Sequence, residues 1–226
     1  MLKGGYALEL RLAGKARATV DIDLNVPPPP EDDLLEVLRI ATDHDLGDFF
    51  RFSITPSPQP LKGPPLGGAR FMVDAILADK TFVKFTIDVG QGDVLLHPVE
   101  WLAGQVNLEF AGLPAVKFPS YPLADHFAEK LHAYTKPREH PTRIKDLIDM
   151  AMILGLGLEP GAGLARAIRA TFARYDTHPL PEALPVPPDA WAEPFEEMAQ
   201  TVDLQPSSMM DWHELLRAFL MRTLAT

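Results

Sequence analysis

The sequence of 226 residues contains no cysteine, which excludes a disulfide framework and any metal site built from thiolates. It also lacks an apolar run of the ~20 residues that cross a bilayer, and no secretory hydrophobic segment opens it. Hydrophobic residues make up 46% and charged residues 23% of the chain, which are ordinary values for a globular protein. We therefore expect a cytoplasmic protein that makes no use of a membrane.

Positive charge is scarce, because 21 Lys and Arg face 31 Asp and Glu, which gives a formal net charge of -10. This balance argues against a protein that coats nucleic acid non-specifically, since attraction to phosphates dominates such binding. The acidic balance is still compatible with an enzyme that binds one RNA end through a local basic patch. The small basic cluster of Lys136, Arg138 and Arg143 is a candidate for such a patch.

Turn formers divide the chain into a half rich in strands and a half rich in helices, which is the pattern of an α+β fold. The predicted strands are Thr19–Val26, Phe49–Thr55, Arg70–Leu77, Phe82–Val89 and Gln105–Phe110. The predicted helices are Glu31–His44, Leu123–Thr135, Arg143–Leu154, Gly163–Tyr175, Ala190–Thr201 and Trp212–Leu224, with a further apolar helix after Gly5. The segment Ala78-Asp79-Lys80-Thr81 is expected to close a hairpin. We expect a mixed β-sheet core over residues 1–120 and a helical domain over 121–226 that completes the cleft.

Three acidic residues on two of these strands are candidate metal ligands. Side chains alternate along a strand, so Val20, Ile22 and Leu24 point one way while Asp21 and Asp23 point the other. Asp88 shares a face with Lys84 and Thr86 in the same manner. Carboxylates that converge from neighbouring strands suit Mg²⁺. The alternatives are a solvated polar strand face for the Asp pair, and Asp74 in place of Asp88.

Other candidates are weaker when each is taken alone. Gly4 and Gly5 could let backbone N–H groups approach a phosphate, or could form an ordinary flexible turn. Lys130 lies at the edge of an apolar helical stripe, where it could snorkel to water or face a triphosphate. In the helix that follows, Lys145, Asp146 and Asp149 could line a cleft, or form a solvated face with a Lys145–Asp149 pair. The spacing of the histidines suggests no zinc site.

The order of these motifs resembles the nucleotidyltransferase superfamily, and within it the AbiEii/AbiGii toxin family. The opening motif is Lys3-Gly4-Gly5-Tyr6-Ala7-Leu8 followed by Thr19-Val20-Asp21-Ile22-Asp23-Leu24. The more specific part comprises Tyr121-Pro122-Leu123, Ala128-Glu129-Lys130-Leu131-His132-Ala133 and Arg143-Ile144-Lys145-Asp146-Leu147-Ile148-Asp149. The resemblance extends from Leu2 to about Leu154.

The resemblance implies a role for each matching residue. Gly4 and Gly5 match the nucleotide-phosphate turn, and Thr19, Lys130 and Lys145 are further candidates for nucleotide binding. Asp21 and Asp23 match the metal-binding pair, and Asp88 matches the third acid, which is the expected base. Lys130 matches an essential lysine near the triphosphate, and Asp146 matches the acid of a Lys-Asp motif. Two Mg²⁺ ions are the implied cofactors.

The implied reaction is transfer of a nucleoside monophosphate from an NTP to a hydroxyl group. Members of the family are toxins of toxin–antitoxin or phage-defence pairs, so the 3′ end of tRNA and a cognate antitoxin are expected partners. A transferase that modifies a protein or a small molecule, and a degenerate non-catalytic binding or regulatory member, are the alternatives. Relatives usually have a segment ahead of the Lys-Gly-Gly motif, so we expect either a misassigned start or a trimmed version whose motif no strand or helix braces.

Overall fold

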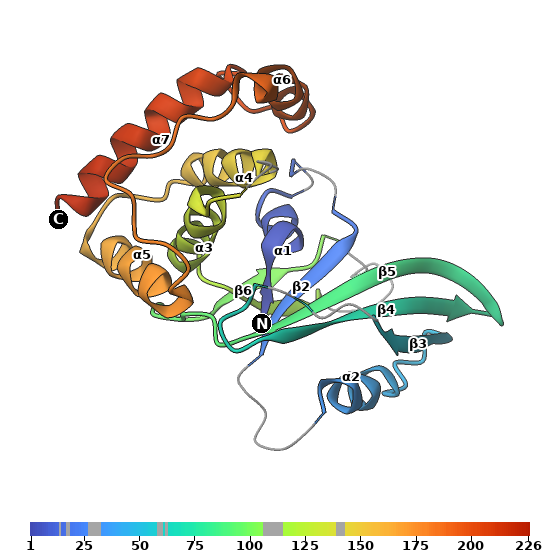
Figure 1. Cartoon of the computed structure of the whole chain (residues 1–226). Helices are drawn as coiled ribbons and strands as arrows, with labels where there is room; N and C mark the ends of the chain where they lie inside the picture. Colours follow the sequence, from blue (N-terminus) through green and yellow to red (C-terminus); the bar gives the residue numbers. More distant parts are fainter. Residues whose placement is uncertain are drawn as a thin grey trace. The chain divides into compact units, whose positions relative to one another are not determined.

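A computed structural model describes residues 1–13, 15–16, 19–26, 33–57, 61, 63–105, 115–138 and 143–226 (Figure 1). The chain divides into two compact units. Unit 1 comprises residues 1–6 and 19–93, and unit 2 comprises residues 7–18 and 94–226. The first helix, α1 (Gly4–Arg11), crosses the boundary between them at Tyr6. No helix in the described part of the chain is long and apolar enough to span a membrane.

Unit 1 is built on a mixed sheet with the strand order β3-β4-β5-β2-β1. The strands are β1 (Leu2–Lys3), β2 (Asp21–Val26), β3 (Phe50–Pro56), β4 (Gly68–Leu77) and β5 (Lys80–Gln91). The pair β2–β5 is parallel, whereas β1–β2, β3–β4 and β4–β5 are antiparallel. The turn between β4 and β5 has positive φ at Ala78 and Asp79, the geometry of a tight hairpin.

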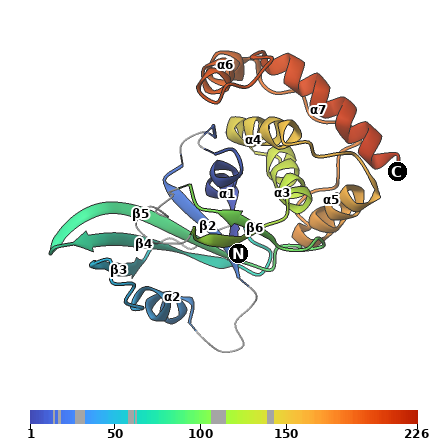
Figure 2. The same cartoon turned by 180° about the vertical axis from the view of Figure 1, so that it is seen from behind.

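One face of the unit 1 sheet is apolar and carries the local core. Alternation along the strands buries Phe71, Val73, Ile87 and Val89, and Ile22 and Leu24 pack against them. Helix α2 (Leu34–Thr42), whose N-cap Asp33 accepts a hydrogen bond from the Leu35 amide, covers this face with its leucines (Figures 1 and 2). The opposite face of the sheet therefore remains available for polar side chains.

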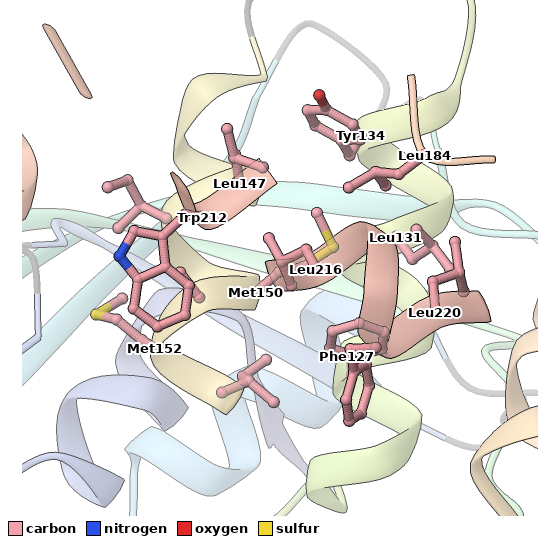
Figure 3. Close-up of a cluster of buried hydrophobic side chains, with 14 of the residues drawn as sticks. Phe127, Leu131, Tyr134, Leu147, Met150, Met152, Leu184, Trp212, Leu216 and Leu220 are labelled. Atoms are coloured by element: carbon pink, nitrogen blue, oxygen red, sulfur yellow. The ribbon is translucent and has the colours of Figure 1, made fainter. Parts of the chain in front are cut away.

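Unit 2 contains a two-stranded antiparallel pair and most of the helices. Its strands are β6 (Glu100–Ala103) and β7 (Lys117–Ser120). Its helices are α3 (Leu123–Thr135), α4 (Ile144–Gly155), α5 (Ala162–Tyr175), α6 (Ala192–Thr201) and α7 (Met209–Leu224), with a 3₁₀ turn at Asp189–Trp191. Figure 3 shows how Phe127 and Leu131 of α3, Met150 of α4 and Leu216 of α7 form the centre of its core.

The predicted α+β fold is confirmed, and most predicted elements match to within a few residues at each end. Three short strands, β1, β6 and β7, were not predicted. The predicted strand Gln105–Phe110 lies, apart from its first residue, outside the described residues. Val20, expected on the apolar face, precedes β2 and is exposed.

A buried histidine in unit 2, His132, is expected to make the stability of the protein sensitive to acid. His132 packs against Tyr175, Phe172 and His178, and its Nε2 lies 2.9 Å from Thr177 Oγ1. Burial, with the nearby charges of His178 and Lys136, lowers the pKa of His132 to about 4. The native imidazole is therefore neutral at a pH where the unfolded chain already takes up a proton.

We expect this histidine to lower the free energy of unfolding as the pH falls from about 6.5 to about 4. The unfolded state binds the extra proton in that window, and the loss should reach about 1–3 kcal/mol, with no effect above it. Urea titrations at a series of pH values test this, with His132→Gln expected to flatten the profile. His44→Gln is the control because His44 is exposed. A profile unchanged by His132→Gln would contradict the assignment.

Candidate active site

The three predicted acids lie on one face of the unit 1 sheet. Because β2 and β5 run parallel, Asp23 is the register partner of Asp88, and Asp21 is the partner of Thr86. These side chains alternate with Ile22, Leu24, Ile87 and Val89 of the apolar face, so they share the opposite, polar face. Asp21 and Asp23 are half-buried, and Asp88 is 9% exposed. Residue 88 therefore lies on the same side of the sheet as residues 21 and 23.

The glycine turn packs directly against one of these carboxylates. Strand β1 pairs with β2 so that Lys3 is opposite Asp23, and Gly4 follows with φ of +63°. A Cβ atom placed on Gly4 would lie 2.6 Å from Cγ and 2.8 Å from Cβ of Asp23, far inside normal contact. Only glycine fits here, for reasons of both backbone conformation and space. The motif is braced by β1, contrary to the expectation that no strand supports it.

Arg70 of β4 is a further member of the polar face that the sequence motifs did not reveal. Its Nε and Nη2 donate to the two carboxylate oxygens of Asp88, at 2.7 and 2.6 Å. These hydrogen bonds, with the charges of Asp88, Asp21 and Asp23, hold the pKa of Arg70 above its ordinary value. The sequence did contain a signal that Arg70 lies on the polar face, because Arg70, Met72 and Asp74 alternate with the buried residues along β4. The partner depends on the register Arg70–Asp88, which that alternation does not give.

The remaining polar side chains extend this face toward β3. Thr86 Oγ1 donates to Asp21 Oδ1. Asp74, the alternative to Asp88, is the register partner of Lys84 and accepts its hydrogen bond at 2.8 Å. A shallow hollow of about 410 Å³ runs over this part of the sheet, and the residues that line it include Asp21, Ser53, Thr55, Asp74, Lys84 and Thr86.

The acids have the donor chemistry of a magnesium site, although Asp88 is engaged by a cation. Carboxylate oxygens from neighbouring positions on one sheet face are the hard ligands that Mg²⁺ prefers. Within the described residues, however, no group of three or more His, Asp or Glu side chains is arranged to hold a metal ion. At this site both carboxylate oxygens of Asp88 accept hydrogen bonds from Arg70. The three acids match the ion in donor type and lie at neighbouring register positions, and Arg70 would compete with the ion for Asp88.

The candidates in the helical half form a second cluster, within unit 2. Lys130 of α3 lies 2.7 Å from Asp149 Oδ2 and 3.3 Å from Asp146 Oδ1, both on α4. Arg143 Nη1 lies 3.4 Å from Asp146 Oδ2. Asp146 and Asp149 are 5% and 0% exposed, so the alternative of a solvated face is wrong for these two acids. Lys145 is exposed, and the ion pair of Asp149 is with Lys130.

The other predicted binding residues lie in unit 1. Thr19 precedes β2, and its hydroxyl donates to the backbone oxygen of Asp21 at 3.4 Å. Gly5 is buried in the first turn of α1, immediately after Gly4. Gly5 and Thr19 therefore both precede the acidic positions in the chain, and Thr19 lies two residues before Asp21.

Comparisons with known proteins agree with these observations. The sequence matches the model of the family "Nucleotidyl transferase AbiEii toxin, Type IV TA system" over residues 1–222. The fold is similar to that of MenT4, a nucleotidyltransferase toxin from Mycobacterium tuberculosis H37Rv, with a TM-score of 0.55 and 17% sequence identity. The similarity covers 100% of this chain and 75% of the MenT4 chain. A search of curated proteins gives no match. Since the family match covers nearly the whole chain, this protein belongs to the AbiEii nucleotidyltransferase toxin family.

Proposed function

We propose that the protein transfers a nucleoside monophosphate from an NTP to a hydroxyl acceptor and releases pyrophosphate. The observation that carries this proposal is the placement of Asp21, Asp23 and Asp88 on one sheet face beside a glycine turn. Glycine backbone near acidic side chains suits a metal–triphosphate substrate, because amides approach phosphates closely while carboxylates hold the metal. Membership of the nucleotidyltransferase family supports the same chemistry.

Asp21, Asp23 and Asp88 would hold two Mg²⁺ ions. When bound, such ions activate the attacking oxygen and neutralise charge on the leaving pyrophosphate. Asp88 would accept the proton of the attacking hydroxyl once Arg70 has released its carboxylate. Gly4 and Gly5, with Thr19, would bind the phosphates of the nucleotide.

For the helical half we keep the role that the family resemblance implies for Lys130, and we assign Asp146, the acid of the Lys-Asp motif, a role from its contact with Lys130. Lys130 would offset negative charge on the triphosphate, and Asp146 would position Lys130, which it already contacts at 3.3 Å. Lys145 is the remaining nucleotide-binding candidate, and its exposed side chain is accessible to solvent and ligands. This division assigns catalysis to residues 1–120 and completion of the nucleotide site to residues 121–226.

The acceptor that we favour is the 3′ end of tRNA, and a cognate antitoxin is the expected cellular partner. A protein or small-molecule acceptor is the alternative within the same chemistry. The alternative without catalysis is a purely binding or regulatory role. The hydrogen bonds from Arg70 to Asp88 favour this non-catalytic role. The acids and the glycine turn favour catalysis.

One assay separates these functions. Purified protein is incubated with each α-labelled NTP and Mg²⁺ against total tRNA, lysate protein or small hydroxyl compounds. Label in tRNA that requires Mg²⁺ and is lost with EDTA is the expected result. Label in protein or in a small molecule would identify that compound, and not tRNA, as the acceptor. The catalytic proposal would be contradicted if no acceptor received label and calorimetry detected no heat of binding for Mg²⁺ and NTP.

The ion pair between Arg70 and Asp88 should compete with magnesium. We expect Arg70→Gln to raise the affinity for Mg²⁺ by about fivefold, the equivalent of about 1 kcal/mol for a partly exposed pair. Calorimetric titration of Mg²⁺ without nucleotide measures this. Arg51→Gln is the matched control, because Arg51 lies on β3 and pairs with the exposed Asp79. Unchanged or weaker Mg²⁺ binding by Arg70→Gln would show that Arg70 does not compete with the ion.

A further inference from the structure

A separate pocket of about 230 Å³ lies within unit 2, where the C-terminal end of α3 meets the segment that precedes α6. It is distinct from the polar face of the unit 1 sheet and from the hollow that adjoins Asp21. Its walls come from Tyr134–Arg138, Arg143, Pro185–Val186, Pro188 and Trp191. These residues combine flat apolar groups with positive charge.

The apolar walls are held in place by contacts within unit 2. The Tyr134 hydroxyl donates to the Pro185 carbonyl at 2.8 Å, which ties the proline-rich segment to α3. The rings of Tyr134 and Trp191 meet edge to face, with centroids 6.3 Å apart. Trp191 is half-buried, so part of its surface remains accessible. Aromatic rings and prolines at one small pocket are suited to packing against a nucleobase.

The charge at this pocket is of one sign. Among the described residues that line it, the charged ones are Lys136, Arg138 and Arg143, all cations. Burial and the charge of Arg143 lower the pKa of Arg138, and the negative charge of Asp146 only partly offsets them, so an additional negative charge would be favourable there. Arg143 donates to Asp146 at 3.4 Å through Nη1, while its buried Nε has no partner among the described residues.

We propose that this pocket binds one nucleotide unit, with the base against Trp191 and the prolines and the phosphate near Arg138 and Arg143. Guanidinium groups are well matched to phosphate oxygens, and the apolar walls would accept any base. The choice of a nucleotide as the ligand rests on the proposed function. A nucleotidyltransferase binds a nucleotide substrate, and one that acts on tRNA also binds an RNA end. The ligand is either a free nucleotide or one unit of a single strand.

Binding measurements on the full chain test the pocket independently of catalysis. Labelled ten-residue RNA homopolymers and the four nucleoside monophosphates are titrated without Mg²⁺, by fluorescence anisotropy and by calorimetry respectively. We expect Arg138→Ala to weaken binding about tenfold and Arg138→Glu to weaken it further. Trp191→Ala should weaken binding by a similar factor, and Trp191→Phe should restore most of it. Arg166→Ala, an exposed cation on α5, should bind like the unaltered protein.

The outcomes separate this inference from the proposed function. Binding of monophosphates that the pocket variants weaken supports a free nucleotide, whereas binding of homopolymers alone supports a strand. Failure of the unaltered protein to transfer label, with nucleotide binding that the pocket variants weaken, concerns only the catalytic site and leaves this inference standing. Absence of binding by the unaltered protein overturns the inference. So does unchanged binding by folded Arg138→Glu, with the fold checked by circular dichroism.

Discussion

Replacing Asp23 by asparagine is expected to lower nucleotide transfer about 10²–10³-fold while the chain stays folded. Asn has nearly the shape of Asp but carries no charge, so it binds a divalent cation far more weakly. Asp23 lies between the Gly4 turn and Asp88, its register partner on β5. The measurement is the initial rate of label transfer from an NTP to the acceptor identified in the first assay, at saturating Mg²⁺.

Asp74→Asn is the matched control for this prediction. Asp74 belongs to the same polar face, but its carboxylate pairs with Lys84 across the exposed part of β4 and β5. An exposed pair of this kind contributes little, so the variant should retain most of the transfer rate. If Asp23→Asn were active and Asp74→Asn inactive, Asp74 would be the metal ligand and the assignment to Asp23 would be wrong.

Alanine at position 4 should cause the second large effect, on both stability and rate. The φ of +63° alone disfavours any side chain, and the new Cβ would overlap the carboxylate of Asp23. We expect the free energy of unfolding to fall by about 2–4 kcal/mol. In the fraction that remains folded, displacement of Asp23 by a few tenths of an ångström or more should lower transfer about 10²-fold.

Gly47→Ala separates the two causes of that effect. Gly47 also has positive φ, +72°, but nothing lies within 4 Å of an added Cβ. It should therefore show only the conformational part, about 1 kcal/mol, with an unchanged transfer rate. Urea titrations of both variants give the comparison. Equal losses of stability at positions 4 and 47 would mean that contact with Asp23 adds nothing.

The sequence predicted those elements whose pattern is local and repeated. Alternation over Arg70–Leu77 and Phe82–Val89 identified the long hairpin, and the apolar stripe of Leu123–Thr135 gave α3 with both ends correct. The missed strands are too short to show a period, since β1 has two residues and β7 has four, one of them Pro119. Their pairing is decided by tertiary contacts.

The candidate site was predictable to the extent that it depends on alternation. That rule placed Asp21, Asp23 and Asp88 on polar faces. Their common face required the parallel pairing of strands 65 residues apart in the chain, as in the register of Asp21 with Thr86. Arg70 was missed for another reason: its pairing with Asp88 depends on the register of the β4–β5 hairpin, which has an irregularity at Ala75/Ile76 that alternation does not give. In the helical half, a wheel assigned Asp149 to a polar face. Its actual burial reflects Lys130 on another helix, a contact that spacing within one helix does not reveal.

The route of the chain through α1 has a consequence for dissection of the protein. One continuous helix supplies Gly4 to unit 1 and Leu8 to the core of unit 2, and the chain then returns to unit 1 at residue 19. A single cut in the polypeptide therefore cannot release either unit whole. A fragment that begins at residue 94 would lack Leu8, and one that ends at residue 93 would carry Leu8 with no core to receive it. The two units are thus interleaved in sequence. A fragment that restores unit 2 would need residues 7–18 joined to residues 94–226, and a fragment that restores unit 1 would need residues 1–6 joined to residues 19–93.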